Sequence, residues 1–103
     1  MNSNRFATAA FLLTVWALPA HADWDVRRAT MSGACSLQPS DSQPKLGVLL
    51  TSKPTIVEAC KAAVDLSTDD PADTSKCYSY TPSSQALCKE KGVPLPGGAN
   101  SNR

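Results

Sequence analysis

The chain has 103 residues, with ten Lys or Arg, nine Asp or Glu and a formal net charge of +1 at pH 7. Proteins that bind nucleic acid or anionic lipid by electrostatics carry a basic face or a basic run. The near-neutral composition therefore argues against both classes. Aromatic residues make up only 6% of the chain, so few large side chains are available for a core.

The first 22 residues have the pattern of a bacterial-type export signal. A short segment with the basic Arg5 precedes an apolar run over 6–18, and Pro19 separates this run from the small-x-small site that ends at Ala22. The apolar run has 13 residues, well short of the roughly 20 that span a bilayer as a helix. We therefore expect cleavage after Ala22, no membrane anchor in the mature chain, and a periplasmic or secreted location.

Cleavage would change the composition of the chain. It removes His21, the only histidine, together with both phenylalanines, and leaves 81 residues with nine basic and nine acidic side chains. A mature chain without histidine has no histidine triad and no histidine general base. A domain of this size has a marginal core and is commonly stapled. We expect a stapled, noncatalytic domain.

The four cysteines are predicted to supply those staples. An even number of cysteines in a short exported chain is typical of a disulfide framework. The chain has no Cys-x-x-Cys pair, and the mature chain has no histidine for a mixed zinc site. Three pairings are possible; nearness in sequence favours Cys35 with Cys60 and Cys77 with Cys88, but does not select them. In the alternative interpretation, the cysteines bind a soft metal or exchange electrons.

Three strands are predicted in the first half of the mature chain. Alternation of Trp24 and Val26 with Asp25 and Arg27 predicts a half-buried strand within 23–31. Shorter strands are predicted over 34–38 and 45–52, and the Pro- and Ser-rich segment 39–44 is predicted to be a loop.

Two helices are predicted in the second half. Thr55 and Glu58 form the pattern of a capping box after Pro54, and the apolar residues that follow recur at helical spacing until Leu66. A second helix is predicted over 82–91, with Thr81 as its N-cap and a glycine after its last residue.

These elements predict an α+β fold. Residues 23–93 are expected to form a small single domain, a short antiparallel sheet covered by two helices and stapled by two disulfides. Residues 94–103 are expected to form a flexible C-terminal tail.

Two sequence motifs resemble functional sites but do not fit them. Asp65, Ser67 and Asp69 begin like a calcium loop, yet Asp70 stands at the required glycine and Lys76 at the position of the bidentate Glu. We therefore expect a solvated turn and no metal site.

The second motif, Ser42-Gln43-Pro44-Lys45, matches the Ser-x-x-Lys pattern of serine acylases. Its proline and its loop setting disfavour the helical turn that would bring the lysine to the serine. We interpret this match as coincidence.

The mature aromatic residues are Trp24, Tyr78 and Tyr80. They are either core residues or contacts with a partner; Tyr78 and Tyr80, two positions apart, would share one strand face. We nominate all three as candidate partner contacts.

The function predicted is that of a noncatalytic exported bacterial interaction protein, of the inhibitor, immunity or accessory-subunit type. We expect a protein partner in the cell envelope, no cofactor and no nucleic acid. The rival is the periplasmic thiol redox or soft-metal-binding protein, and a small hydrolase using carboxylates is a third possibility.

Overall fold

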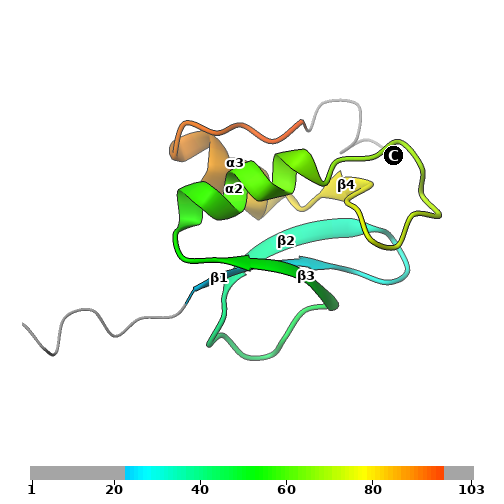
Figure 1. Cartoon of the computed structure of the whole chain (residues 1–103), viewed down its shortest axis with the longest axis horizontal. Helices are drawn as coiled ribbons and strands as arrows, with labels where there is room; N and C mark the ends of the chain where they lie inside the picture. Colours follow the sequence, from blue (N-terminus) through cyan, green and yellow to red (C-terminus); the bar gives the residue numbers. More distant parts are fainter. Residues whose placement is uncertain (1–22, 97–103) are drawn as a thin grey trace, which may run out of the picture.

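The structure is a computed structural model that describes residues 23–96 (Figure 1). The predicted export signal, residues 1–22, and residues 97–103 of the predicted tail lie outside the described residues. Between residues 23 and 96, no helix is long and apolar enough to cross a membrane.

The described chain contains a four-stranded sheet with the strand order β3-β1-β2-β4. The strands are β1 (Trp24–Arg28), β2 (Ala34–Pro39), β3 (Val48–Lys53) and β4 (Ser79–Tyr80), and the helices are α2 (Ile56–Asp65) and α3 (Pro82–Glu90). β1 runs antiparallel to β2 and β3, and β4 adds a two-residue parallel pairing to β2. The predicted α+β domain with a short sheet and two helices is confirmed.

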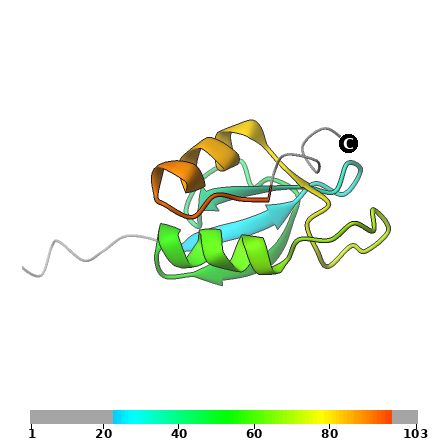
Figure 2. The same ribbon diagram turned by 90° about the horizontal axis from the view of Figure 1, so that it is seen from above.

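Both helices lie on the same side of the sheet (Figure 1), and in the view from above they run beside each other over the strands (Figure 2). The sheet therefore has one face covered by helices. Along β1, Val26 points to this covered face, because it is fully buried in the core and pairs with Leu37 of β2. Neighbouring residues of a strand point to opposite faces, which places Asp25 and Arg27 on the other face.

The helices begin where their capping residues predict. The Thr55 side chain accepts a hydrogen bond from the Glu58 amide at 3.1 Å, and the Thr81 side chain accepts one from the Ser84 amide at 3.4 Å. Each bond satisfies an amide that the first helical turn leaves unpaired. Ser84 is itself buried, and its hydroxyl accepts a hydrogen bond from the Leu37 amide at 2.9 Å, which ties the start of α3 to β2.

The two disulfides join Cys35 to Cys77 and Cys60 to Cys88. The pairing favoured by nearness in sequence is therefore wrong. α2 and α3 pack against each other, which brings Cys60 to Cys88. Cys77 lies beside β2 because Tyr78 donates a backbone hydrogen bond to Gly33 at 3.0 Å.

The packed chain continues beyond the predicted domain end at residue 93. Leu95 is buried and belongs to the core cluster, although the sequence analysis assigned residues 94–103 to a flexible tail. This apolar residue therefore corrects the prediction for the first part of the tail. The buried apolar core consists of small and medium side chains: Val26, Leu37, Ala59, Ala63, Tyr80, Leu95 and the four cysteines.

Candidate functional site

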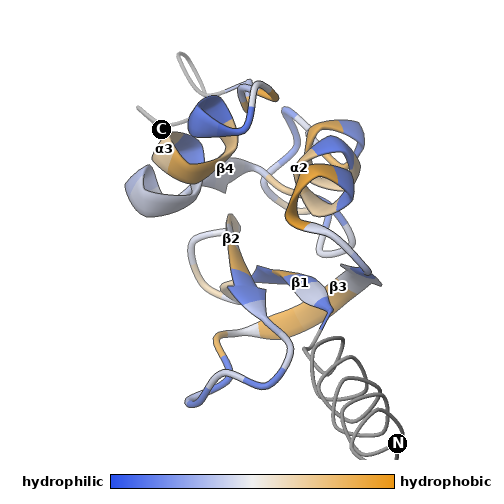
Figure 3. Ribbon diagram, turned by 90° about the vertical axis from the view of Figure 1, so that its left-hand side faces the viewer, coloured by the Kyte–Doolittle hydropathy of each residue, from blue (hydrophilic) through white to orange (hydrophobic). Residues whose placement is uncertain are grey.

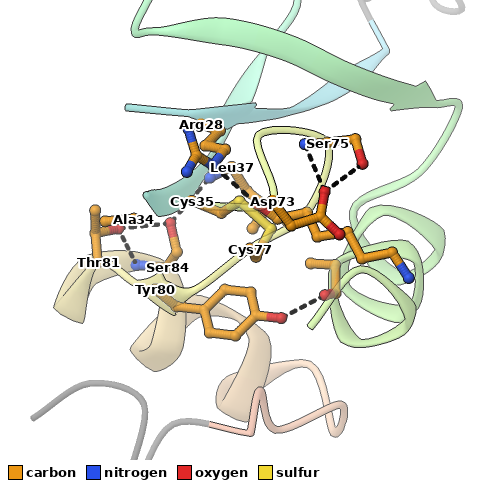
Figure 4. The surroundings of a disulfide bond; sticks show 12 residues. Arg28, Ala34, Cys35, Leu37, Asp73, Ser75, Cys77, Tyr80, Thr81 and Ser84 are labelled. Carbon is orange, nitrogen blue, oxygen red and sulfur yellow. Dashed lines mark hydrogen bonds between the residues drawn. A yellow bond between two sulfur atoms is a disulfide. The ribbon is translucent and has the colours of Figure 1, made fainter. Parts of the chain in front are cut away.

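Tyr80, one of the three nominated contact residues, belongs to the core. Its side chain is 2% exposed, and its hydroxyl donates a hydrogen bond to the carbonyl oxygen of Ala63 at 2.5 Å (Figure 4). Burial raises the pKa of the Tyr80 phenol, and a hydrogen bond with Ser67 only partly offsets that effect. This corrects the nomination of Tyr80, because a partner does not reach a buried ring without opening the core.

Trp24 and Tyr78 are both partly buried and lie at opposite ends of the sheet. Trp24 begins β1, pairs with Pro39 and packs against the core. Tyr78 hydrogen-bonds through its backbone to Gly33, which lies before the other end of β2. The structure therefore does not bring the three nominated aromatic residues together on one surface.

The four cysteine sulfurs are enclosed. All four cysteines are 0% exposed, and none of those in the described chain is free. Figure 4 shows the Cys35–Cys77 bond beneath β2 with polar side chains around it. In this arrangement the disulfides connect β2 to the loop before β4, and α2 to α3.

The acidic segment after α2 folds into local turns. Asp70 accepts a hydrogen bond from the Ala72 amide at 2.9 Å, and Asp73 accepts bonds from the Ser75 hydroxyl at 2.7 Å and the Ser75 amide at 3.1 Å. The hydrogen bonds from Ser75 lower the pKa of Asp73. Within residues 23–96, no group of three His, Cys, Asp or Glu side chains is placed to hold a metal ion.

The contacts of Lys45 in the Ser-x-x-Lys match do not favour acylase chemistry. Its ammonium group donates a hydrogen bond to the carbonyl oxygen of Ser40. The match lies in a loop with a cis peptide bond between Gln43 and Pro44, where the serine and the lysine do not lie on one helical turn.

The sheet face opposite the helices carries a buried carboxylate that the sequence analysis missed. Asp25 is 4% exposed; the hydroxyls of Ser40 and Ser52 each donate to it at 2.6 Å, and Arg27 bonds it at 3.3 Å. Burial alone would raise the pKa of Asp25, but these hydrogen bonds outweigh it and lower the pKa. Strand alternation predicted a polar position here, but gave no sign of the loop that covers it.

That covering loop is anchored to the same face. Arg27 donates to the carbonyl oxygens of Leu46 at 2.7 Å and Gly47 at 3.2 Å. Gln38 donates to the carbonyl oxygen of Pro44 at 3.3 Å and accepts from the Leu46 amide at 2.9 Å. The loop is thus held over β1 and β2 before it enters β3.

Arg28 is a second buried charge, on the helix-covered face of β1. It is 4% exposed and donates to the carbonyl oxygens of Lys76 at 3.0 Å and Pro71 at 3.3 Å. Figure 4 shows its guanidinium close to the Cys35–Cys77 bond. The loop before β4, which contains Pro71, Lys76 and Cys77, is therefore held to the sheet by a disulfide and by an arginine.

Large apolar side chains are exposed at one end of the sheet. Within the described chain, those with most exposure are Met31 at 97%, Leu46 at 48%, Val48 at 51% and Leu49 at 48%. Val48 pairs with Arg28 at the end of β1, and Met31 lies in the turn directly after that end. We call these four residues the β3 corner.

The β3 corner lies partly on β3, which carries an orange hydrophobic stretch in Figure 3. Val48 and Leu49 are adjacent in the strand and point to opposite faces. The sequence predicts a strand over 45–52, which includes Val48 and Leu49, but alternation alone does not predict an exposed apolar surface there. A run of consecutive apolar residues was the available signal, because a half-buried strand covers only alternate positions.

A surface depression lies between α2 and the chain after α3. It has a volume of about 490 Å³ and is lined by Lys61, Val64 and Asp65 from α2 and by Gly92, Val93 and Pro94. Its only charged side chains are one lysine and one aspartate, both exposed.

Comparison of the chain with protein-family models, with curated proteins and with solved structures gave no match.

Proposed function

We propose that this protein is a noncatalytic, exported bacterial interaction protein that binds a protein partner through a rigid, disulfide-stapled surface. The observation that carries the proposal is the β3 corner, where four large apolar side chains are 48–97% exposed near one end of β1 and β3. Exposed large apolar side chains that are grouped at one end of a domain are typical of protein interaction sites.

The construction of the domain supports a binding role. The loop before β3 is tied down through Arg27 and Gln38, and the rest of the domain is crosslinked by two buried disulfides. A surface that is ordered before binding loses less conformational entropy when the partner arrives. The β3 corner is therefore preorganised for recognition.

The two disulfides fit an oxidising, extracellular setting. Together with the export signal predicted in residues 1–22, they support a periplasmic or secreted location. We place the partner in the same compartment, in the cell envelope.

The rival thiol or metal function has less support. All four cysteines are paired and 0% exposed. Thiol–disulfide exchange requires a thiolate to reach a sulfur atom of the bond, and its rate depends on access. The buried disulfides therefore favour a structural role for the cysteines.

The proposal is tested by photo-crosslinking in the exported fraction of the producing cells. A photoreactive amino acid is incorporated at position 31, at the centre of the exposed turn, and in a matched control at position 89, an exposed site on α3. We expect a discrete adduct from position 31 that excess unlabelled protein suppresses, and no such adduct from position 89. The absence of a competable adduct from position 31 would contradict the proposal.

A further inference from the structure

The loop between β2 and β3 presents one peptide bond, between Lys45 and Leu46, to the outside of the molecule. Residues 43–47 are all exposed, and the loop crosses the sheet on the side away from the helices (Figure 1). Exposed loops are the places where proteases reach a folded chain. The Lys45–Leu46 bond is therefore accessible to the active site of a protease.

The backbone on both sides of this bond is held by side chains of the sheet. Before the bond, the carbonyl oxygen of Pro44 accepts a hydrogen bond from Gln38 at 3.3 Å. After it, the Leu46 amide donates to Gln38 at 2.9 Å, and the Leu46 carbonyl oxygen accepts from Arg27 at 2.7 Å. The Gln38 side chain thus bridges the bond, and β1 and β2 fix the positions of its two flanks.

Lys45 itself keeps its backbone groups available to a partner. Within residues 23–96, its amide and its carbonyl oxygen make no hydrogen bond, and its ammonium group lies on the Ser40 carbonyl oxygen in an exposed contact. A carboxylate is a stronger partner for an ammonium group than a peptide carbonyl is. The acidic pocket of a protease that cleaves after basic residues can therefore draw this side chain away from the loop.

The other exposed lysines of the described chain do not offer such a site. Lys61 and Lys89 lie inside α2 and α3, where the backbone is bonded within the helix. The amides of Lys76 and Lys91 donate to carbonyl oxygens within their own turns. Among the exposed lysines of residues 23–96, the loop lysine alone combines a free amide with a free carbonyl oxygen.

The fixed flanks make cleavage of this bond reversible. A serine protease bonds its serine oxygen to the Lys45 carbonyl carbon, the bond to the Leu46 nitrogen breaks, and the serine proton passes through the histidine to that nitrogen. With an ordinary substrate the new amine leaves, and water hydrolyses the ester. Here Arg27 and Gln38 keep the Leu46 amine beside the acyl carbon, so it reforms the peptide bond and restores the serine hydroxyl.

The Cys35–Cys77 disulfide strengthens this restraint. Its two cysteines lie on opposite sides of position 45 in the chain, and β1 and β3, which pair with each other, also lie on opposite sides. A cut after Lys45 therefore leaves two pieces that stay joined. Because the pieces do not separate, cleavage gains none of the translational freedom that favours release of an ordinary product.

We propose that the loop over residues 43–47 inhibits a serine protease that cleaves after basic residues, with Lys45 in the specificity pocket of the enzyme. This inference rests on the proposed function, since it names the kind of partner and the loop through which that function acts. Leu46 and Val48, which belong to the β3 corner, lie directly after the bound bond and contact the same enzyme.

The probe is trypsin, assayed on a small chromogenic substrate in the presence of the disulfide-bonded mature protein. We expect an inhibition constant of about 1 μM or lower, within the range of interfaces of standard size. On long incubation, mass spectrometry should find slow cleavage at the Lys45–Leu46 bond alone. Before reduction, the cleaved protein should keep its intact mass plus one water.

Matched variants test the role of the lysine. Lys45→Ala should raise the inhibition constant at least about 100-fold, because it removes the side chain that fills the pocket. Lys45→Arg should retain inhibition, because it keeps the charge. Lys89→Ala, at an exposed position of α3, should leave the inhibition constant within about twofold.

A further variant tests the restraint on the loop. Gln38→Ala should make cleavage at the Lys45–Leu46 bond about tenfold faster, because it removes the hydrogen bonds on both flanks. Cleavage after the other lysines should stay unchanged, whereas a variant that simply unfolds would be cut at all of them.

Three results would overturn the inference. They are a lack of trypsin inhibition, inhibition that survives Lys45→Ala, and cleavage at the Lys45–Leu46 bond as fast as in the reduced, unfolded chain. If any of these occurs while the crosslink from position 31 still forms, protease inhibition fails and the interaction function stands. If the crosslink is absent, the proposed function itself fails.

Discussion

Asp25 shows how one residue can have a role that strand periodicity does not reveal. The alternation of β1 correctly places it on the face away from the helices, but the loop before β3 then encloses it. Its carboxylate receives hydrogen bonds from Ser40, Ser52 and Arg27. Each of these three residues comes from a different segment, so the charge joins the β1 strand, the loop and the β3 strand.

The charge of Asp25 should make the stability depend on pH. The pKa of Asp25 in the folded state lies below the ordinary aspartate value of 3.8. The charged form therefore stabilises the fold fully above that value, and the contribution is lost as pH falls through the folded-state pKa. We expect Asp25→Asn to lower the free energy of unfolding by about 1 to 3 kcal/mol at pH 7. The difference from the wild type should be smaller at pH 2 than at pH 7.

Denaturant unfolding at the two pH values measures this difference. Asp41→Asn is the matched control, because Asp41 is exposed in the neighbouring loop. A constant difference between wild type and Asp25→Asn at both pH values would mean that the carboxylate charge does not stabilise the fold.

At the scale of elements, the helices were easier to predict than the strands. Thr55 and Thr81 mark helix starts through local hydrogen bonds that involve only the next three residues. The starts of the two helices are therefore encoded locally. The two-residue strand β4 depends on contacts with Ala34 and Cys35, more than 40 positions earlier, and its pairing has no local signal.

The entry into β3 depends on Gly47. This residue has a φ of +57°, and a Cβ atom at this position would lie far inside van der Waals contact with the carbonyl oxygen of Arg28. Both the backbone conformation and the space therefore require glycine. A larger residue would push the start of β3 away from β1.

We expect Gly47→Ala to destabilise the protein substantially more than Gly92→Ala. Gly92 has a φ of +82° but no atom within 4 Å of the added Cβ, so its substitution carries only the backbone strain of about 1 to 3 kcal/mol. Thermal unfolding of the two variants provides the comparison. Equal losses would show that the contact with Arg28 is not restrictive.

At the scale of the whole molecule, the disulfides replace part of the core that the sequence lacks. Two bridges are predicted from the sequence, but the pairing that it favours is wrong, because nearness along the chain is the only criterion. Loop-closure entropy rises slowly with loop length, so packing of α2 on α3 decides the partner of Cys60. The place of the β3 corner at the edge of the sheet was likewise beyond prediction, since strand order determines which strand lies at an edge.

Loss of both disulfides should unfold the domain. Bridges that close loops with separations of 42 and 28 residues contribute roughly 3.9 and 3.6 kcal/mol on the chain-entropy estimate. Their sum is comparable to the whole stability of a small domain, which is about 5 to 15 kcal/mol. We expect a variant with all four cysteines changed to serine to show the circular dichroism of an unfolded chain at 37 °C. The two double variants, Cys35→Ser with Cys77→Ser and Cys60→Ser with Cys88→Ser, should each retain a cooperative transition at a lower temperature. A fourfold variant with native circular dichroism would contradict the stapling role.

The most direct test of the central claim is amide hydrogen exchange of the protein with and without the partner recovered by crosslinking. If the domain binds its partner through the β3 corner, exchange should slow at residues 46–53 and in the turn around Met31, and stay unchanged on the exposed faces of α2 and α3. Slowing confined to the helices, with β3 unaffected, would contradict binding through the β3 corner.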